Sequence, residues 1–228
     1  MDPSRRSALS FPAPWALHGE GAMLFYRLPA AFAREHGGIP ESLAPAFQGI
    51  VACVMLVDYR HSPVGPYREL LFIPGLFGTE RGRRFSITRI YVDSQESMEW
   101  GRRNWAIPKA MADFHWKRTG PFADEVQVSR QHNGSAQPLL DVVIKGVGPR
   151  FPISTALIPL RIYQELDGRT VETSPRGKGK GQWARVSRLK VHTDAFPDIS
   201  AYRPFAALRV SGFQMTFPSG KNVLVKRF

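Results

Sequence analysis

Short runs of apolar residues, separated at close intervals by glycine, proline, Asn-Gly and Asp-Gly, make up most of the chain. Runs of this length between turn residues are typical of β-strands. Many short strands with few helices indicate a mainly antiparallel β (α+β) fold, built as a barrel or a sandwich. The pattern predicts strands at 22–28, 49–59, 67–73, 85–92, 109–118, 124–131, 138–146, 151–163, 169–174, 182–193, 205–217 and 222–227.

One short helix, at about 94–103, interrupts this series of strands. Asp93 is expected to cap its first turn, because Glu96 stands three residues later, as in a capping box. Pro108 prevents the helix from continuing further along the chain. The helix therefore delivers Lys109 to the first position of the following strand.

Two segments fall outside the predicted strands. Residues 1–21 contain several prolines and come before the first predicted strand, so we expect an irregular N-terminal arm. The basic, glycine-rich segment 175–181 lies between two predicted strands and is expected to be a flexible hairpin loop. No internal repeat or domain boundary is evident, and a length of 228 residues suits one all-β domain covering 1–228.

Composition narrows the setting. No apolar stretch approaches the eighteen residues of a membrane-spanning helix, so no membrane partner is expected. Pro12 and Pro14 break up the region that a signal peptide would need. Cys53 is the single cysteine and excludes an intrachain disulfide, which makes a reducing, cytoplasmic location the simplest interpretation.

The net charge of +12 is compatible with three kinds of anionic partner: a nucleic acid, an anionic surface or an anionic small substrate. The segment 175–181 lacks the spacing of a phosphate-binding loop, and aromatic residues do not alternate with its cations, so no nucleic-acid partner is expected. The six histidines and Cys53 show no metal-ligand spacing. The sequence thus predicts no metal and no cofactor.

Lys109 has an unusual sequence neighbourhood for a cation. Trp105, Ile107, Met111 and Phe114 surround it along the chain. A lysine stem often covers apolar surface while its ammonium reaches water. Alternatively, burial favours the neutral amine, which is a nucleophile toward ketones and aldehydes. The residues themselves leave both interpretations open.

Three segments around this lysine resemble the active-site signature of the acetoacetate decarboxylase family. They are Ile90-Tyr91-Val92-Asp93, Gly101-Arg102 and Trp105-Ala106-Ile107-Pro108-Lys109. In that family the first lysine after the proline forms a Schiff base with the substrate ketone. Lys109 falls on this position, and the resemblance also implies substrate contacts from Arg102, Trp105, Ile107 and Tyr91.

A second match lies earlier in the chain. Tyr67-Arg68-Glu69, an apolar run and Pro74 are similar to the family stretch that supplies a catalytic-site glutamate, which implies that role for Glu69. The resemblance extends over roughly 20–217. It implies a cone-like antiparallel β-barrel with surrounding sheet, usually in a homo-oligomer, that acts without a cofactor on a small-molecule keto acid.

The sequence also departs from the family pattern. Ala110 replaces the second, adjacent lysine, and the expected arginine is absent near 18–20. A carboxylate is missing at about 53–55, and Gly-Arg-Glu has become Gly101-Arg102-Arg103. The first hypothesis is a lyase that decarboxylates a β-keto acid through Lys109. The alternatives are an aldolase-dehydratase acting on an α-keto acid and an aldehyde, a non-catalytic ligand-binding barrel, and an anion-binding or nucleic-acid-binding β-protein.

Overall fold

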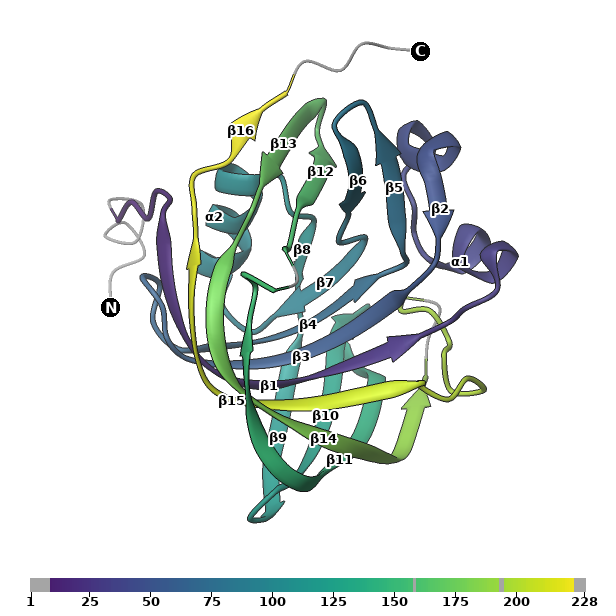
Figure 1. Cartoon of the computed structure of the whole chain (residues 1–228), viewed down its shortest axis with the longest axis vertical. Helices are drawn as coiled ribbons and strands as arrows, with labels where there is room; N and C mark the ends of the chain where they lie inside the picture. The colour runs from purple at the N-terminus through teal and green to yellow at the C-terminus, as the bar shows by residue number, and fades with distance from the viewer. Residues whose placement is uncertain (1–8, 158, 193–194, 224–228) are drawn as a thin grey trace.

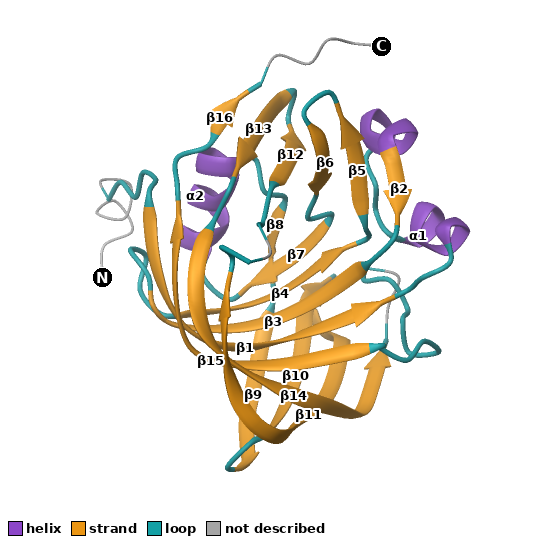
Figure 2. Cartoon of the chain, in the orientation of Figure 1, coloured by secondary structure: helices purple, strands orange, loops and turns teal. Residues whose placement is uncertain are grey.

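The computed structural model describes residues 9–157, 159–192 and 195–223, which form two β-sheets with three short helices (Figure 1). The helices are α1 (Ala30–His36), the 3-10 helix η2 (Glu41–Ala46) and α2 (Gln95–Trp105). Figure 2 shows that strands dominate and that the large sheet curls into a half-barrel beside the smaller sheet. The prediction of a mainly antiparallel β fold is confirmed.

The large sheet contains ten strands and the small sheet six. Neighbouring strands are antiparallel except in the pairs β7–β8 and β6–β12, which are parallel. The order in the large sheet is β8 (Lys109–Met111), β7 (Arg89–Val92), β4 (Tyr67–Ile73), β3 (Ala52–His61), β1 (Trp15–Tyr26), β15 (Ala206–Phe217), β14 (Arg176–Val191), β11 (Ser135–Ser154), β10 (Ala123–His132) and β9 (Asp113–Gly120). The order in the small sheet is β16 (Lys221–Asn222), β13 (Arg169–Thr173), β12 (Ile162–Leu166), β6 (Gly82–Phe85), β5 (Leu76–Thr79) and β2 (Phe47–Gly49).

Two apolar clusters lie on opposite faces of the large sheet, because successive side chains of a strand point to opposite sides. On β4, Leu70 and Phe72 belong to the first cluster, whereas Leu71 and Ile73 belong to the second. The second cluster also includes Trp105 at the end of α2 and Ile162 on β12. This face of the sheet is therefore packed against α2 and the small sheet.

The predicted arm at 1–21 is wrong from Trp15 onward, since β1 begins there and pairs with both β3 and β15. The Trp15 indole is 1% exposed and donates a hydrogen bond to the carbonyl of Phe11 at 2.9 Å. Burial of this ring anchors the strand seven residues before the predicted start. Residues 1–8 lie outside the described part of the chain.

The segment 175–181 was also predicted incorrectly, because from Arg176 onward it is part of β14, with β15 on one side and β11 on the other. Its glycines suit a strand here, since the space above them is already filled. A Cβ at Gly179 would lie 3.0 Å from the Cβ of Phe213 on β15. The glycines of this segment are therefore explained by close packing between strands and do not mark a loop.

Other predicted strands are divided in the structure: 85–92 covers the end of β6 and all of β7, and 109–118 covers β8 and most of β9. The strand expected at 151–163 is in fact the end of β11 and the start of β12, with a turn between them. The strand expected at 222–227 lies mostly outside the described residues. Within the described part of the chain, no helix is long and apolar enough to span a membrane.

Helix α2 begins one residue later than predicted from the capping pattern. Ser94, not Asp93, caps it by accepting a hydrogen bond from the Ser97 amide at 3.1 Å. Asp93 instead accepts a hydrogen bond from the Arg68 amide at 2.6 Å, which ties it to β4. The helix ends at Trp105, and the next residue, Ala106, caps it with a left-handed φ of 53°. This sharp end turns the chain into β8 and places Lys109 on the large sheet.

Candidate active site

Lys109 is buried where β8 joins the large sheet beside Ile90 of β7. The residue is 4% exposed. Its ammonium donates one hydrogen bond to Oε2 of Glu69 at 2.8 Å and another to Oγ of Ser97 at 3.0 Å. Lys109 therefore does not extend into water. It is held by one carboxylate and one hydroxyl inside the second apolar cluster.

Two tyrosines complete the polar surroundings of this pair. Tyr59 donates a hydrogen bond to Oε1 of Glu69 at 3.3 Å, and the ring of Tyr67 lies 5.0 Å from the lysine nitrogen. Burial, and then the charge of Glu69, raises the pKa of both phenols well above its ordinary value. Both tyrosines consequently remain neutral, so they serve the site as hydrogen-bonding groups.

Helix α2 covers the lysine with a single face. Its fully or nearly buried residues Ser97, Gly101 and Trp105 are spaced four apart, so they lie on one side of the helix. Gly101 leaves room for the lysine stem, because a Cβ there would lie 2.7 Å from Cδ of Lys109. The helix therefore supplies a hydrogen-bond partner and a close-fitting wall in successive turns.

The structure brings Lys109, Glu69, Trp105 and Ile107 to the same face of the large sheet. Trp105 packs edge-on against Trp15 at 5.0 Å between ring centroids and donates a hydrogen bond to the carbonyl of Pro218 at 2.7 Å. Trp105 and Ile107 thus belong to the apolar cluster on the lysine's side of the sheet.

The predicted substrate contacts from Tyr91 and Arg102 are not supported by their positions. Tyr91 points to the opposite face of the sheet, where its hydroxyl donates a hydrogen bond to the carbonyl of Ala195 at 2.7 Å. The alternation of side chains along β7 causes this, because neighbouring Ile90 takes the face of Lys109. Arg102 is exposed, outside the buried face of α2.

Sequence reasoning missed Ser97, Tyr59 and Tyr67. The two tyrosines flank the turn between β3 and β4 and pair directly across the two strands. That hairpin register was the available signal, since residues opposite one another share a face of the sheet. Ser97 lies one helical turn before Gly101, which was the only local sign that it faces the same way.

Among the residues that the structure describes, no second cation contacts the pair formed by Lys109 and Glu69. Gly19 and Gly21 are the β1 positions opposite Tyr59 and Val57 on this face. A Cβ at Gly19 would lie 2.2 Å from the backbone oxygen of Asp58, so a larger residue does not fit without a backbone shift. The charged group that contacts the ammonium is a carboxylate rather than a second cation.

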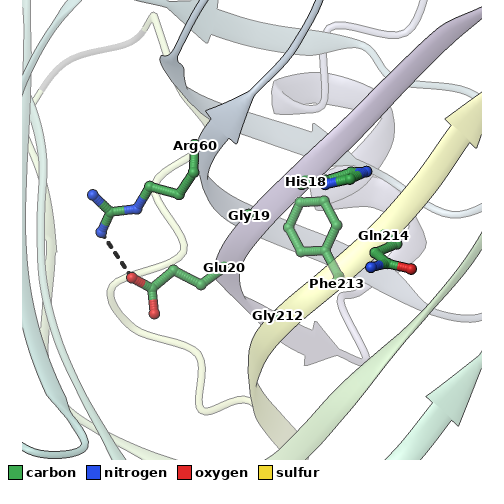
Figure 3. A pocket seen from close by; sticks show the side chains of 7 residues that line it. All are labelled: His18, Gly19, Glu20, Arg60, Gly212, Phe213 and Gln214. Carbon is green, nitrogen blue, oxygen red and sulfur yellow. Dashed lines mark hydrogen bonds and ion pairs between the residues drawn. The ribbon is translucent and has the colours of Figure 1, made fainter.

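A separate ionic cluster occupies the opposite face of the large sheet. Arg209 is buried and donates a hydrogen bond to Asp124 at 2.7 Å, and it lies 3.4 Å from Glu20. Arg60 and Arg118 also pair with Glu20, at 2.8 and 2.7 Å (Figure 3 shows the Arg60 contact). The cluster ties β1, β9, β10 and β15 together. Because it does not share a face with Lys109, we assign it a structural role.

These ion pairs determine how the carboxylates titrate. Burial by itself raises the pKa of Glu20, but hydrogen bonds from Arg60 and Arg118 hold that pKa below its ordinary value. The same balance applies to Asp124, where burial is outweighed by Arg209 and the pKa is lowered. Burial raises the pKa of Cys53 to about 12, so its thiol stays protonated. Among the residues that the structure describes, no group of three or more His, Cys, Asp or Glu side chains is arranged to hold a metal ion.

Comparison with known proteins gives the family. The model of the acetoacetate decarboxylase family matches residues 1–137. The chain belongs to this family. The matched segment includes the strands that carry Glu69 and Lys109 and the whole of α2. Membership therefore rests on the part of the chain that builds the buried pair.

A curated relative and several solved structures show a broader likeness. The chain is 28% identical over 101 residues to "Protein NEOXANTHIN-DEFICIENT 1" of Oryza sativa subsp. japonica, and the match covers 44% of this chain but only 33% of that protein. An acetoacetate decarboxylase structure superposes with a TM-score of 0.72 at 12% identity, covering 95% of this chain and 92% of that one.

Two other structures have the same architecture. The acetoacetate decarboxylase from Legionella pneumophila superposes with a TM-score of 0.69 at 14% identity, covering 98% of this chain and 96% of that chain. The enduracididine biosynthesis enzyme MppR, complexed with pyruvate, gives a TM-score of 0.67 at 16% identity, covering 97% and 94%. At these identities the likeness establishes the fold.

Proposed function

We propose that the protein is a lyase that forms a Schiff base between Lys109 and a β-keto acid and releases carbon dioxide. The observation that carries this proposal is the burial of the Lys109 amine, 4% exposed, within 2.8 Å of the Glu69 carboxylate. A lysine placed on an apolar wall is a suitable nucleophile only after losing its proton. Glu69 is the carboxylate positioned to accept that proton.

The proposed reaction then proceeds in four steps. The neutral amine attacks the carbonyl carbon, and loss of water gives a protonated imine. Carbon dioxide leaves, and the electron pair of the broken C–C bond moves into the imine to form an enamine. A proton adds to the enamine carbon, with Glu69 as the nearest acid. Water finally hydrolyses the imine, which releases the ketone and restores Lys109.

The surroundings of Lys109 favour a substrate with an apolar substituent. Across the sheet, Lys109 is followed by Ile90, Leu71, Met55 and Met23 in direct register on one face. Met55 and Met23 are only partly buried, so this apolar row becomes more exposed with distance from the lysine. An apolar wall also favours loss of charge from a substrate carboxylate as it becomes carbon dioxide.

A second reaction on the same lysine deserves a direct test. The MppR structure that contains a condensation product of pyruvate and imidazole 4-carboxaldehyde has this fold, with a TM-score of 0.65 at 16% identity. The imine on Lys109 would serve aldol condensation and dehydration equally well, because it stabilises a carbanion. The family arginine that would bind a substrate carboxylate is absent near 18–20, and this absence favours the alternative reaction.

The proposed function predicts a substrate series with a definite trend. Each methylene buried along the apolar row adds about 0.8 kcal/mol, so kcat/KM for straight-chain β-keto acids is expected to rise about fourfold per added methylene before levelling off. Measuring carbon dioxide release and ketone formation for β-keto acids of increasing chain length tests this trend in kcat/KM. A kcat/KM that does not change with chain length contradicts the preference for an apolar substituent. Condensation of pyruvate with an aldehyde, without carbon dioxide release, contradicts decarboxylation.

A further inference from the structure

The first half of β14 displays cations on one face of the sheet and glycines on the other. Arg176, Lys178 and Lys180 alternate along the strand and are all exposed. The intervening glycines allow close packing on the opposite face. A Cβ at Gly177 would lie 3.1 Å from the Cβ of Met215, and one at Gly181 would lie 2.8 Å from Cγ2 of Ile153. The basic segment is thus a regular row of cations on a firmly packed strand.

The cation row has neutral neighbours. Lys178 pairs in register with Gln214 on β15 and with Ser154 on β11, while Arg176 pairs with Thr216. The next strand, β1, places His18 opposite Gln214. Within the described ranges, the side chains of Arg176, Lys178 and Lys180 form no ion pair. These positive charges are therefore not neutralised by the fold.

A cavity of about 820 Å³ lies against this row. Among the residues that the structure describes, its lining includes Arg161, Arg176 and Lys178, and no carboxylate. Hydroxyl groups supply the other polar contacts, from Ser154, Thr155, Ser174 and Thr216. A smaller cavity of about 280 Å³ adjoins it at His18 and Gln214 (Figure 3). The one carboxylate there, Glu20, is already paired with Arg60 at 2.8 Å.

We propose that the larger cavity is a binding site for an organic phosphate of nucleotide size. Its volume lies in the range of about 300–1,000 Å³ that small-molecule sites occupy. Three cations that line one cavity with no acid among them favour a ligand carrying several negative charges. Phosphate groups provide these charges together with several strong acceptor oxygens for arginine, lysine and hydroxyl donors. A net charge of +12 adds long-range attraction.

This site is separate from the one proposed for keto acids. On β15, the cavity residues Gln214 and Thr216 alternate with Phe213 and Phe217, which pack with the cluster around Lys109. Met215 lies between them and belongs to both the cavity lining and that cluster, but the lining contains none of Lys109, Glu69 and Ser97. Phosphate binding does not depend on Schiff-base chemistry, and either proposal can fail without the other.

Isothermal titration calorimetry of the purified chain tests the proposal with ATP, pyrophosphate and adenosine as probes. We expect ATP to bind, adenosine not to bind, and Arg176→Gln/Lys178→Gln to weaken ATP binding on the order of 10–100-fold. The matched control is Lys145→Gln/Arg185→Gln. It removes two exposed cations that pair across β11 and β14 outside the cavity, so affinity should stay within about twofold.

Each other outcome overturns the proposal. Equal weakening in both double variants means that only overall charge matters. If a single-stranded oligonucleotide binds more tightly than ATP and its affinity grows with its length, the basic surface binds a polyanion and the cavity is not a small-ligand site. If the parent chain is folded by circular dichroism and melting but gives no heat of binding with ATP or pyrophosphate, the proposed site does not exist. Because the changed residues are exposed, all variants should fold.

Discussion

Replacing Lys109 by methionine should lower the free energy of unfolding by about 3–5 kcal/mol, because it leaves a buried carboxylate without its cation. Glu69 is 4% exposed and accepts a hydrogen bond from Lys109 at 2.8 Å. Methionine retains the apolar bulk of the stem beside Gly101, so lost packing contributes little. Urea unfolding at neutral pH, followed by far-UV circular dichroism, measures the change.

A second substitution separates charge from packing. In Lys109→Met/Glu69→Gln the uncompensated carboxylate is gone, while Tyr59 can still donate its hydrogen bond to the amide oxygen. We expect this double variant to recover most of the stability that Lys109→Met loses. A single variant that loses less than about 1 kcal/mol, the range of exposed pairs, contradicts the burial of this ion pair.

Replacing Arg209 by methionine is expected to cost a similar amount, about 3–5 kcal/mol, at the ionic cluster on the other face. The side chains of Arg209 and Asp124 are each 5% exposed and lie 2.7 Å apart. Arg188→Met is the matched control, because Arg188 pairs with Glu125 at the surface. An exposed pair contributes at most about 1 kcal/mol, so the control should unfold nearly as the parent does.

The Arg209 prediction also has a definite pH dependence. Folding lowers the pKa of Glu20 and Asp124, so their stabilising contribution is complete above the ordinary carboxyl pKa of about 4. It is lost as the pH falls through their folded-state pKa values. Asp58 opposes this trend, since burial raises its pKa. The gap between parent and Arg209→Met should therefore be largest near neutral pH and narrow in acid; a constant gap contradicts the ionic origin.

The sequence predicted the two residues of the buried pair but not their surroundings. The motif ending at Lys109 and the stretch containing Glu69 are local patterns, and the structure joins them at 2.8 Å. Ser97 and Tyr59 carry no local sign of function. Their roles depend on which side of α2 or β3 meets the lysine, and that is decided by tertiary packing.

The strand pattern predicted the fold class well, but it misjudged several segments, among them 15–21 and 175–181. Prolines before Trp15 suggested an irregular arm, yet burial of the indole outweighs them and β1 starts at once. The glycines of 175–181 suggested a loop because glycine usually marks a turn. In β14 they are needed for close contact with Phe213 and its neighbours, which only the three-dimensional arrangement reveals.

Borohydride trapping tests the central claim most directly. The chain is incubated with a panel of β-keto acids, pyruvate and aldehydes, reduced, digested, and searched for added mass by mass spectrometry. The account predicts one reduced adduct, on the peptide containing Lys109, and none at that position in Lys109→Arg, which keeps a cation for Glu69 but cannot form the imine. No adduct in a folded sample, or adducts spread evenly over exposed lysines, would contradict the proposed chemistry and favour a ligand-binding barrel.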